Sequence, residues 1–291
     1  MSKVRNAATA MGVLVVLSLV AVMQQNVLAR QAGTDLILVP VSVSDSKNVP
    51  VTNLKREDFQ LLEDNKEQQI TQFTNASDPV TLGVVLGLSA RGPVKTPGQT
   101  DRVSVDILKA VDRVREAHPA GAIAQSPFDG DSMFDVVSKG MDALAKQSGP
   151  KKAMVIVSDG YISSGSQTSS VPMPKSLIEA SKTAPFPIFF LFPSTSTTPP
   201  PFTDGSAYAV GYYLEQIADF SGGEMITGVI ENDLSKVSSD LRDRVKNLYV
   251  LGFRSPNTAK DGKWRKLAVK VPASGSKVKI ASKSRYFVPK G

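Results

Sequence analysis

Three short segments carry the side chains with which this chain could do chemistry. They are residues 87–91 (GLSAR), 129–132 (DGDS) and 158–160 (SDG), and each supplies hydroxyl or carboxylate oxygens. Such oxygens, together with water, are the ligands that Mg²⁺ takes in near-octahedral array. The candidate binding residues are Ser89, Arg91, Asp131, Ser132 and Asp159. Three of them are candidate metal ligands, for which Mg²⁺ is the one cofactor considered: Ser89, Asp131 and Asp159.

Composition removes many other kinds of site. The 291-residue chain has no cysteine and a single histidine, His118. Disulfides, thiolate zinc sites, a cysteine nucleophile and multi-histidine metal sites are therefore excluded. Hydrophobic residues make up 41% of the chain and charged residues 21%, which is ordinary globular composition and excludes wholesale disorder, collagen or a coiled coil.

A catalytic use of these residues is the less favoured interpretation. Residues 87–91 partly match the Gly-x-Ser-x-Gly nucleophile elbow, but the last glycine is absent. His118 precedes Asp159, whereas that hydrolase order is serine, acid, histidine, and a serine without a general base is a poor nucleophile. Asp159 could also serve only to cap the next turn. We therefore expect no enzyme, with a serine hydrolase using Ser89 as an alternative.

Alternating strands and helices must position these segments. Apolar runs predict buried strands at 81–88, 153–157 and 187–192, and a short strand at 224–227. Helical spacing predicts helices at 102–117, 132–147, 175–183 and 208–220, the last ending at Gly222-Gly223, and a further helix capped by Asn232-Asp233. This pattern predicts an α/β fold with a mainly parallel, Rossmann-like sheet and helices on both faces. Ligands of such sheets bind at the carboxyl ends of the strands.

Both ends of the chain instead have β-strand patterns. Strand-length segments lie at 35–45 and 57–73, where Asp64-Asn65 marks a hairpin, and at 249–253, 266–271, 277–281 and 285–288. Neither end holds enough strands to be stable alone, so we expect them to pair. The predicted organisation is a discontinuous β module (34–77 and 248–289) that carries an inserted α/β domain (78–247).

The N-terminus has the pattern of a secretory signal. Lys3 and Arg5 precede 17 uncharged residues, 7–23, and Val27-Leu28-Ala29 follows as a cleavage signal. We expect residues 1–29 to be removed and the protein to be exported to the periplasm, the cell envelope or the medium, with no transmembrane segment after signal removal. An uncleaved anchor is the alternative, although 17 residues are marginal for a membrane span.

Charge is distributed unevenly over the chain. The formal net charge is +7, but residues 246–291 alone carry +11 and residues 30–245 carry −6. The basic tail is either a solvated strand face or a surface that attracts anionic envelope polymers. Nucleic acid is not an expected partner of an exported protein with so few aromatic residues in that tail. We expect a protein or a cell-envelope polymer instead.

Nearly all of the mature sequence resembles the von Willebrand factor A-related domains of exported bacterial proteins. The resemblance rests on VPVSVSDSKNVPVTNLKREDFQLLEDNKEQQITQF near the start, and on VIVSDG and the GG at 222–223 before the last strand of the parallel sheet. It rests also on NLYVLGF, DGKWRKLAVKV and RYFVP near the end. It implies a von Willebrand A-like fold and a metal-ion-dependent adhesion site. Between the first helix and the segment at 129–132, residues 118–128 leave room for one short strand, so we expect a sheet trimmed on that side.

The adhesion site implied by the resemblance is degenerate in this chain. Its first aspartate falls on Gly87, its two serines on Ser89 and Arg91, its threonine on Asp131 or Ser132, and its last aspartate on Asp159. A carboxylate is replaced by glycine and a hydroxyl by a cation, whose repulsion of a metal ion about 4–5 Å away costs a few kcal/mol. We therefore expect a non-catalytic, adhesion or scaffold module, with Mg²⁺-dependent adhesion as the alternative.

Overall fold

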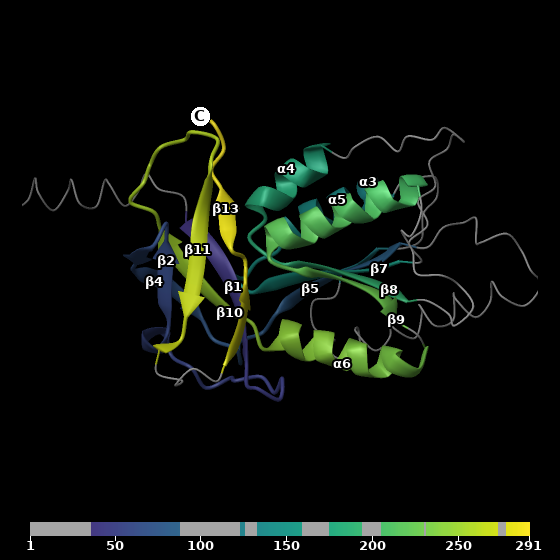
Figure 1. Ribbon diagram of the computed structural model, residues 1–291, viewed down its shortest axis with the longest axis horizontal. Helices are drawn as coiled ribbons and strands as arrows, with labels where there is room; N and C mark the ends of the chain where they lie inside the picture. The colour runs from purple at the N-terminus through teal and green to yellow at the C-terminus, as the bar shows by residue number, and fades with distance from the viewer. Residues whose placement is uncertain are drawn as a thin grey trace, which may run out of the picture.

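The computed structural model describes residues 36–87, 123–125, 133–158, 175–193, 205–229, 231–272 and 278–291. It shows a mixed α/β protein with one parallel sheet, which is packed with helices, and two antiparallel sheets. The antiparallel sheets lie at one end of the parallel sheet (Figure 1). Among the described residues, no helix has both the length and the apolar character needed to cross a membrane.

The parallel sheet has the strand order β6-β5-β7-β8-β9. Its strands are β5 (Thr81–Gly87), β6 (Ile123–Gln125), β7 (Lys152–Ser158), β8 (Ile188–Pro193) and β9 (Glu224–Val229). The buried strand β7 coincides with the predicted apolar run, and β9 extends two residues beyond its predicted end at Thr227. Between β5 and α3, the described part of the chain contains one short strand, the three-residue β6 at the sheet edge.

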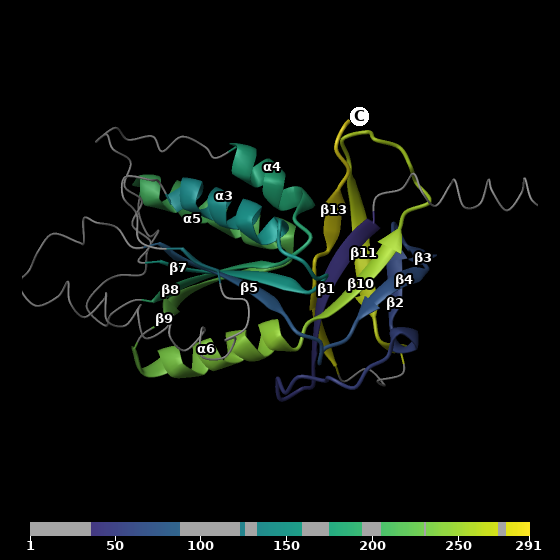
Figure 2. The same ribbon diagram turned by 180° about the vertical axis from the view of Figure 1, so that it is seen from behind.

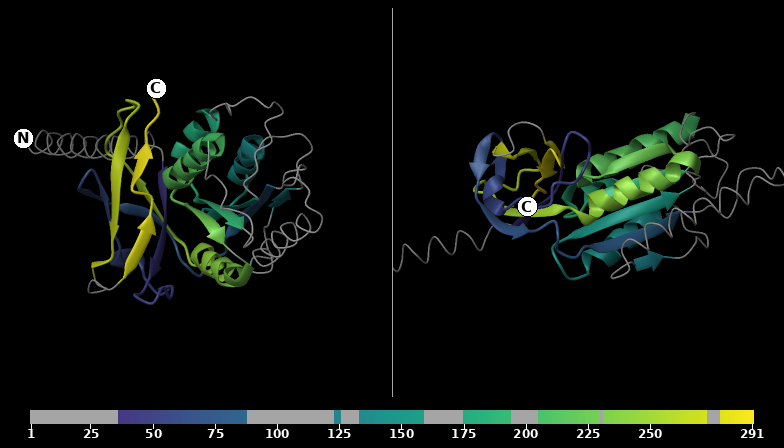
Figure 3. Two further views of the ribbon diagram at one scale, coloured as in Figure 1. Left: turned by 45° about the vertical axis from the view of Figure 1, so that its right-hand side comes forward. Right: turned by 90° about the horizontal axis from the view of Figure 1, so that it is seen from below.

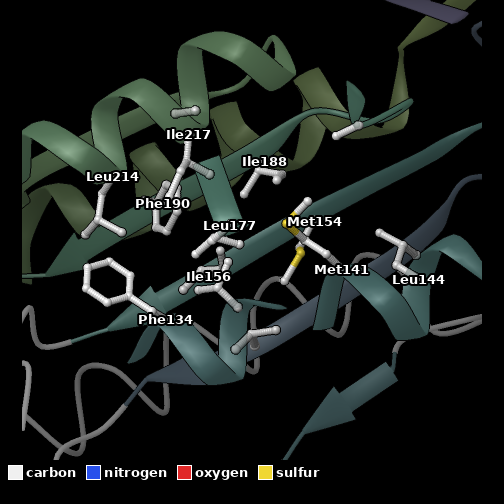
Figure 4. Packing of buried hydrophobic residues seen from close by; sticks show 14 of the residues in the cluster. Phe134, Met141, Leu144, Met154, Ile156, Leu177, Ile188, Phe190, Leu214 and Ile217 are labelled. Atoms are coloured by element: carbon white, nitrogen blue, oxygen red, sulfur yellow. The ribbon is translucent and has the colours of Figure 1, made fainter. Parts of the chain in front are cut away.

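Helices cover both faces of this sheet. On one face lie α3 (Met133–Ala145), α4 (Lys175–Thr183) and α5 (Gly205–Ser221), and on the other lies α6 (Glu231–Lys246) (Figure 2). The side chains of α3, α4 and α5 meet those of β7 and β8 in one apolar cluster, of which Figure 4 shows Phe134, Leu177, Leu214 and Phe190. Burying each such side chain contributes about 1.5–3 kcal/mol. The helix predicted at 102–117 lies outside the described residues.

One helix start differs from its prediction. Asn232 and Asp233 were expected to precede α6 as a cap, but the helix begins at Glu231, so both residues lie in its first turn. Carboxylates there are favourable because the helix N-terminus carries partial positive charge. The glycine stop of α5 is observed: Gly222 has φ of +85°, and the Gly223 N–H donates to the Ala218 carbonyl at 2.8 Å.

Strands from both chain ends build the two antiparallel sheets, which share one core and form a β sandwich. One sheet has the order β12-β1-β10-β4 and the other β13-β11-β2-β3. The strands are β1 (Leu36–Ser44), β2 (Gln60–Glu63), β3 (Lys66–Gln68), β4 (Ile70–Thr74), β10 (Tyr249–Arg254), β11 (Trp264–Lys270), β12 (Lys279–Ser282) and β13 (Arg285–Phe287). Figure 3 shows the N-terminal strands (purple to blue) beside the C-terminal ones (yellow). The domain boundaries at 78 and 247 stay a prediction.

The hairpin predicted at Asp64-Asn65 joins β2 to β3. Glu63 pairs with Lys66, and both loop residues have positive φ, as a two-residue hairpin loop requires. A short 3-10 turn at Arg56–Asp58 precedes β2. The sandwich core is rich in aromatic contacts, with the rings of Phe59 and Tyr249 5.1 Å apart.

Candidate functional site

The candidate site lies at the carboxyl edge of the parallel sheet, where β5 and β7 end together. The two strands are paired over their full length, and their last residues, Gly87 and Ser158, are Cα partners. The chain leaves them in opposite directions along the sheet, because β5 is followed by β6 on one side and β7 by β8 on the other. Neighbouring strands of this kind form the switch point at which parallel sheets bind ligands.

The third predicted segment leads into the same edge. Helix α3 begins at Met133, directly after Ser132. A Cβ on Gly140 would meet Val85, whereas Leu144, nearer the end of the helix, packs against Gly83, nearer the start of β5. Helix α3 therefore runs antiparallel to β5, and its first turn lies toward the carboxyl edge.

The predicted site residues themselves lie outside the described part of the chain. These residues are Ser89, Arg91, Asp131, Ser132 and Asp159. What the structure brings together is their flanks: Gly87 two residues before Ser89, Ser158 directly before Asp159, and Met133 directly after Ser132. Their role as site residues stays a prediction.

The expectation that this edge holds no firmly bound Mg²⁺ stays a prediction, because the predicted ligands lie outside the described residues. At the end of β5, where the resemblance places the first carboxylate, Gly87 offers no side-chain oxygen. In the sequence, Arg91 stands four residues further, at the position where the resemblance implies a second hydroxyl ligand. Among the described residues, no three His, Cys, Asp or Glu side chains are grouped so that they could hold a metal ion. We derive no chemistry through a metal here.

Buried charges lie at the opposite, amino edge, and the sequence analysis did not anticipate them. Lys151 directly precedes β7 and is 1% exposed. Its ammonium donates to the carbonyls of Ala76 (2.6 Å), Asp78 (2.9 Å) and Lys246 (2.7 Å). Because 75–80 leads into the parallel sheet and 246–248 leads out of it, one side chain holds both connections to the sandwich. Burial lowers the pKa of Lys151 to about 8.

A second buried lysine joins the sandwich to the end of α4. Lys283, between β12 and β13, is 4% exposed and donates to the Ala184 carbonyl at 2.8 Å. Burial lowers its pKa to about 8 as well. Close by, the ring of Trp264 lies 4.9 Å from that of Phe220 at the end of α5. Lys283 stands between the strands predicted at 277–281 and 285–288. This position was the one sequence signal that could have indicated its contact with Ala184.

A buried polar network lies inside the sandwich. The Tyr286 hydroxyl donates to one oxygen of the Glu63 carboxylate, and the Ser255 hydroxyl donates to the other at 2.8 Å. Burial and the adjacent carboxylate raise the pKa of Tyr286. The network ties β13 and the end of β10 to β2, so it links strands from both chain ends. Its donors and acceptors satisfy one another, which is typical of a structural network.

No protein family model matches the sequence, and no curated protein matches it. Among solved structures, the fold is similar to the D319A mutant of the PilB minor pilin from Streptococcus sanguinis, with 14% sequence identity and a TM-score of 0.37. The match covers 58% of this chain and 62% of that one. At this level the similarity carries no argument about function.

Proposed function

We propose that this protein is an exported, von Willebrand A-like module that binds a protein or cell-envelope polymer without catalysis. The binding surface is the carboxyl edge of the parallel sheet, formed by Ser89, Arg91, Asp131, Ser132 and Asp159. The observation that carries the proposal is the pairing of Gly87 with Ser158, since it makes two of the three polar segments leave adjacent strand ends at the switch point.

The chemistry of the predicted residues supports binding over metal-dependent adhesion. Arg91 and Asp159 are of opposite charge, so an internal ion pair can replace the ion that the degenerate site has lost. Hydroxyl, carboxylate and guanidinium groups on loops held by a rigid sheet are typical of a recognition surface. At the opposite edge of the sheet, Lys151 and Lys283 make buried contacts that hold the sandwich.

Capture from cell-envelope fractions tests the proposal. The mature chain, residues 30–291, is immobilised and compared with Arg91→Ala, Asp159→Ala and Lys66→Ala; Lys66 is an exposed residue of β3 in the sandwich. We expect the first two substitutions to reduce capture of a partner at least tenfold and Lys66→Ala to leave it unchanged. Equal capture by all four proteins would contradict the proposal.

Two further arms separate the alternatives. Capture that is unchanged by EDTA supports metal-free binding, whereas its loss in EDTA and its return with Mg²⁺ favour metal-dependent adhesion. Labelling with a fluorophosphonate probe tests the hydrolase alternative. We expect no label on Ser89, because no histidine follows it in the order that such hydrolases use.

A further inference from the structure

A cavity of about 440 Å³ lies at the amino edge, between the sandwich and the end of α4. Its walls come from the start of β1, from residues 182–185, from 255–260 and from 283–289. Among the described residues that line it are three lysines, Lys182, Lys260 and Lys283, and no aspartate or glutamate. The remaining walls are mainly apolar, including Leu36, Leu38 and Phe287. The cavity is therefore apolar with positive charge at its walls.

One wall of this cavity is an unpaired strand edge. β12 pairs with β1 only over Val41–Ser44, because the chain leaves that sheet after Ser282 and enters the other one as β13. On this side of β1, residues 36–38 have no partner strand among the described residues. These residues are half-buried and line the cavity. An extended segment placed in the cavity would lie beside them.

The backbone of Leu36 and Leu38 faces this open side. Pro40 pairs with Val250 of β10 but has no N–H, so its nitrogen must point away from β10. Backbone groups of a strand alternate in direction, so the N–H and C=O groups of Leu38 and Leu36 point the same way as those of Pro40. Two N–H donors about 7 Å apart are thus directed toward the cavity. The start of β1 can therefore pair with a further strand on this side.

Lys283 supplies a charge that the cavity does not neutralise. Its ammonium has three N–H donors, and among the described residues it has one acceptor, the Ala184 carbonyl. Lys182 by contrast is paired with Glu179 at 2.5 Å. A buried cation beside a cavity whose described walls hold no acidic side chain is stabilised by an incoming carboxylate, which forms a charge-assisted hydrogen bond.

We propose that this cavity binds an extended peptide segment, which adds to β1 beside Leu36–Leu38 and presents a carboxylate to Lys283. Main-chain hydrogen bonds supply affinity in this kind of recognition, and side-chain pockets supply specificity. The carboxylate belongs either to an acidic side chain or to the C-terminus of the peptide. The site is separate from the carboxyl edge, and it stands whether or not that edge binds a partner.

Affinity selection from synthetic random heptapeptide libraries tests this inference. One library carries free C-termini and the other amidated C-termini, and the bait is the mature chain, residues 30–291. Enrichment from both, with Asp or Glu in the selected peptides, assigns the carboxylate to a side chain; enrichment from the free library alone assigns it to the C-terminus. Lack of enrichment from either library, or selected peptides without a carboxylate, would overturn the proposal.

Two substitutions test the two halves of the site. Leu38→Pro removes the outward N–H while keeping the β10 pairing, as Pro40 already does two residues later, and Leu38→Ala is its matched control. We expect a more than tenfold loss of peptide affinity for Leu38→Pro and for Lys283→Met, and less than threefold for Leu38→Ala. Unchanged affinity in Leu38→Pro would rule out strand addition.

A measurement on the unmodified protein guards against misfolded variants. Hydrogen exchange of the Leu36 and Leu38 amides should slow at least tenfold when a selected peptide is bound, while the control Lys66→Ala leaves peptide binding unchanged. Exchange rates that do not change with bound peptide would contradict the proposed mode. Acetate that competes at the same concentration as the peptides would show that a carboxylate alone binds, and it would also contradict strand addition.

Discussion

The two edges of the parallel sheet differ in what their residues do. At the amino edge, Lys151 and Lys283 use buried ammonium groups to hold the sandwich against the α/β unit. At the carboxyl edge, β5 and β7 end in register at Gly87 and Ser158 and lead into short polar segments. The difference indicates that the buried lysines of the amino edge stabilise the molecule, and it supports the proposal that the carboxyl edge binds a partner.

Loops at the end of a rigid sheet can change in sequence without loss of the fold, because few buried contacts depend on them. Buried charges cannot change in this way, since removing one partner leaves the others unsatisfied. Substitution of Lys151 or Gly223 at the amino edge should therefore alter stability, and substitutions at the proposed carboxyl-edge site should alter binding of its partner.

The largest effect is expected from Gly223→Ala. A Cβ at this position would lie 1.8 Å from the Ile188 carbonyl oxygen, so the start of β8 must move. We expect a loss of about 4 kcal/mol in the free energy of unfolding, measured with urea. Gly149→Ala is the control: φ is +91° there, but the nearest atom is 4.0 Å away, and the expected loss is about 1 kcal/mol. Similar losses for both would show that the amino edge is not tightly packed.

The second largest loss in the free energy of unfolding is expected from Lys151→Met. It leaves the buried carbonyls of Ala76, Asp78 and Lys246 without their donor, at a cost of about 3 kcal/mol. The adjacent Lys152→Met removes one bond to Ala145 at the more exposed neighbouring position, and we expect less than about 1 kcal/mol. Urea unfolding of both variants makes the comparison. Equal stability of the two variants would contradict the role given to Lys151.

The buried lysines also predict how stability depends on pH. The pKa of Lys283 is about 8 in the folded protein and near 10.5 when unfolded, so the unfolded chain binds more protons between these values. Stability should therefore rise by roughly 1–3 kcal/mol from pH 8 to pH 10 and fall at higher pH, where the raised pKa of Tyr286 acts in the opposite direction. Lys283→Met should show a smaller rise in unfolding midpoints across this range.

The smallest effect on stability is expected at the carboxyl edge. Ser89→Ala, Arg91→Ala and Asp159→Ala should each change the free energy of unfolding by no more than about 0.5 kcal/mol, as is usual for surface substitutions. The same urea titrations measure this. A loss above about 2 kcal/mol for any of the three would show that the residue stabilises the fold, and it would contradict its assignment to the binding surface.

Much of the α/β pattern follows from the sequence because apolar periodicity is local. The helix predicted at 175–183 is α4, with the same bounds, and the apolar run at 153–157 predicts β7. Burial of Lys151 and Lys283 depends on carbonyls far along the chain, up to 99 residues away, and no local pattern reports such contacts. The predicted start of α6 was wrong because asparagine is common at the position before a helix and can also occupy its first turn, as Asn232 does here.

The candidate site itself stays a prediction, since its five residues lie outside the described part of the chain. The carboxyl edge follows from the strand–helix alternation and the rule for parallel sheets, and the register of Gly87 with Ser158 came from the structure. The cavity at the amino edge depends on where β12 leaves its sheet, which is set by tertiary pairing and has no sequence signature.

Site-specific photo-crosslinking in the producing cells tests the central claim most directly. A photoreactive residue is placed at position 89, at the carboxyl edge, or at position 66, on the exposed part of β3. Our account predicts a discrete adduct from position 89 and none from position 66. An adduct of equal yield from position 66, or none from position 89, would contradict the assignment of the carboxyl edge as the binding surface.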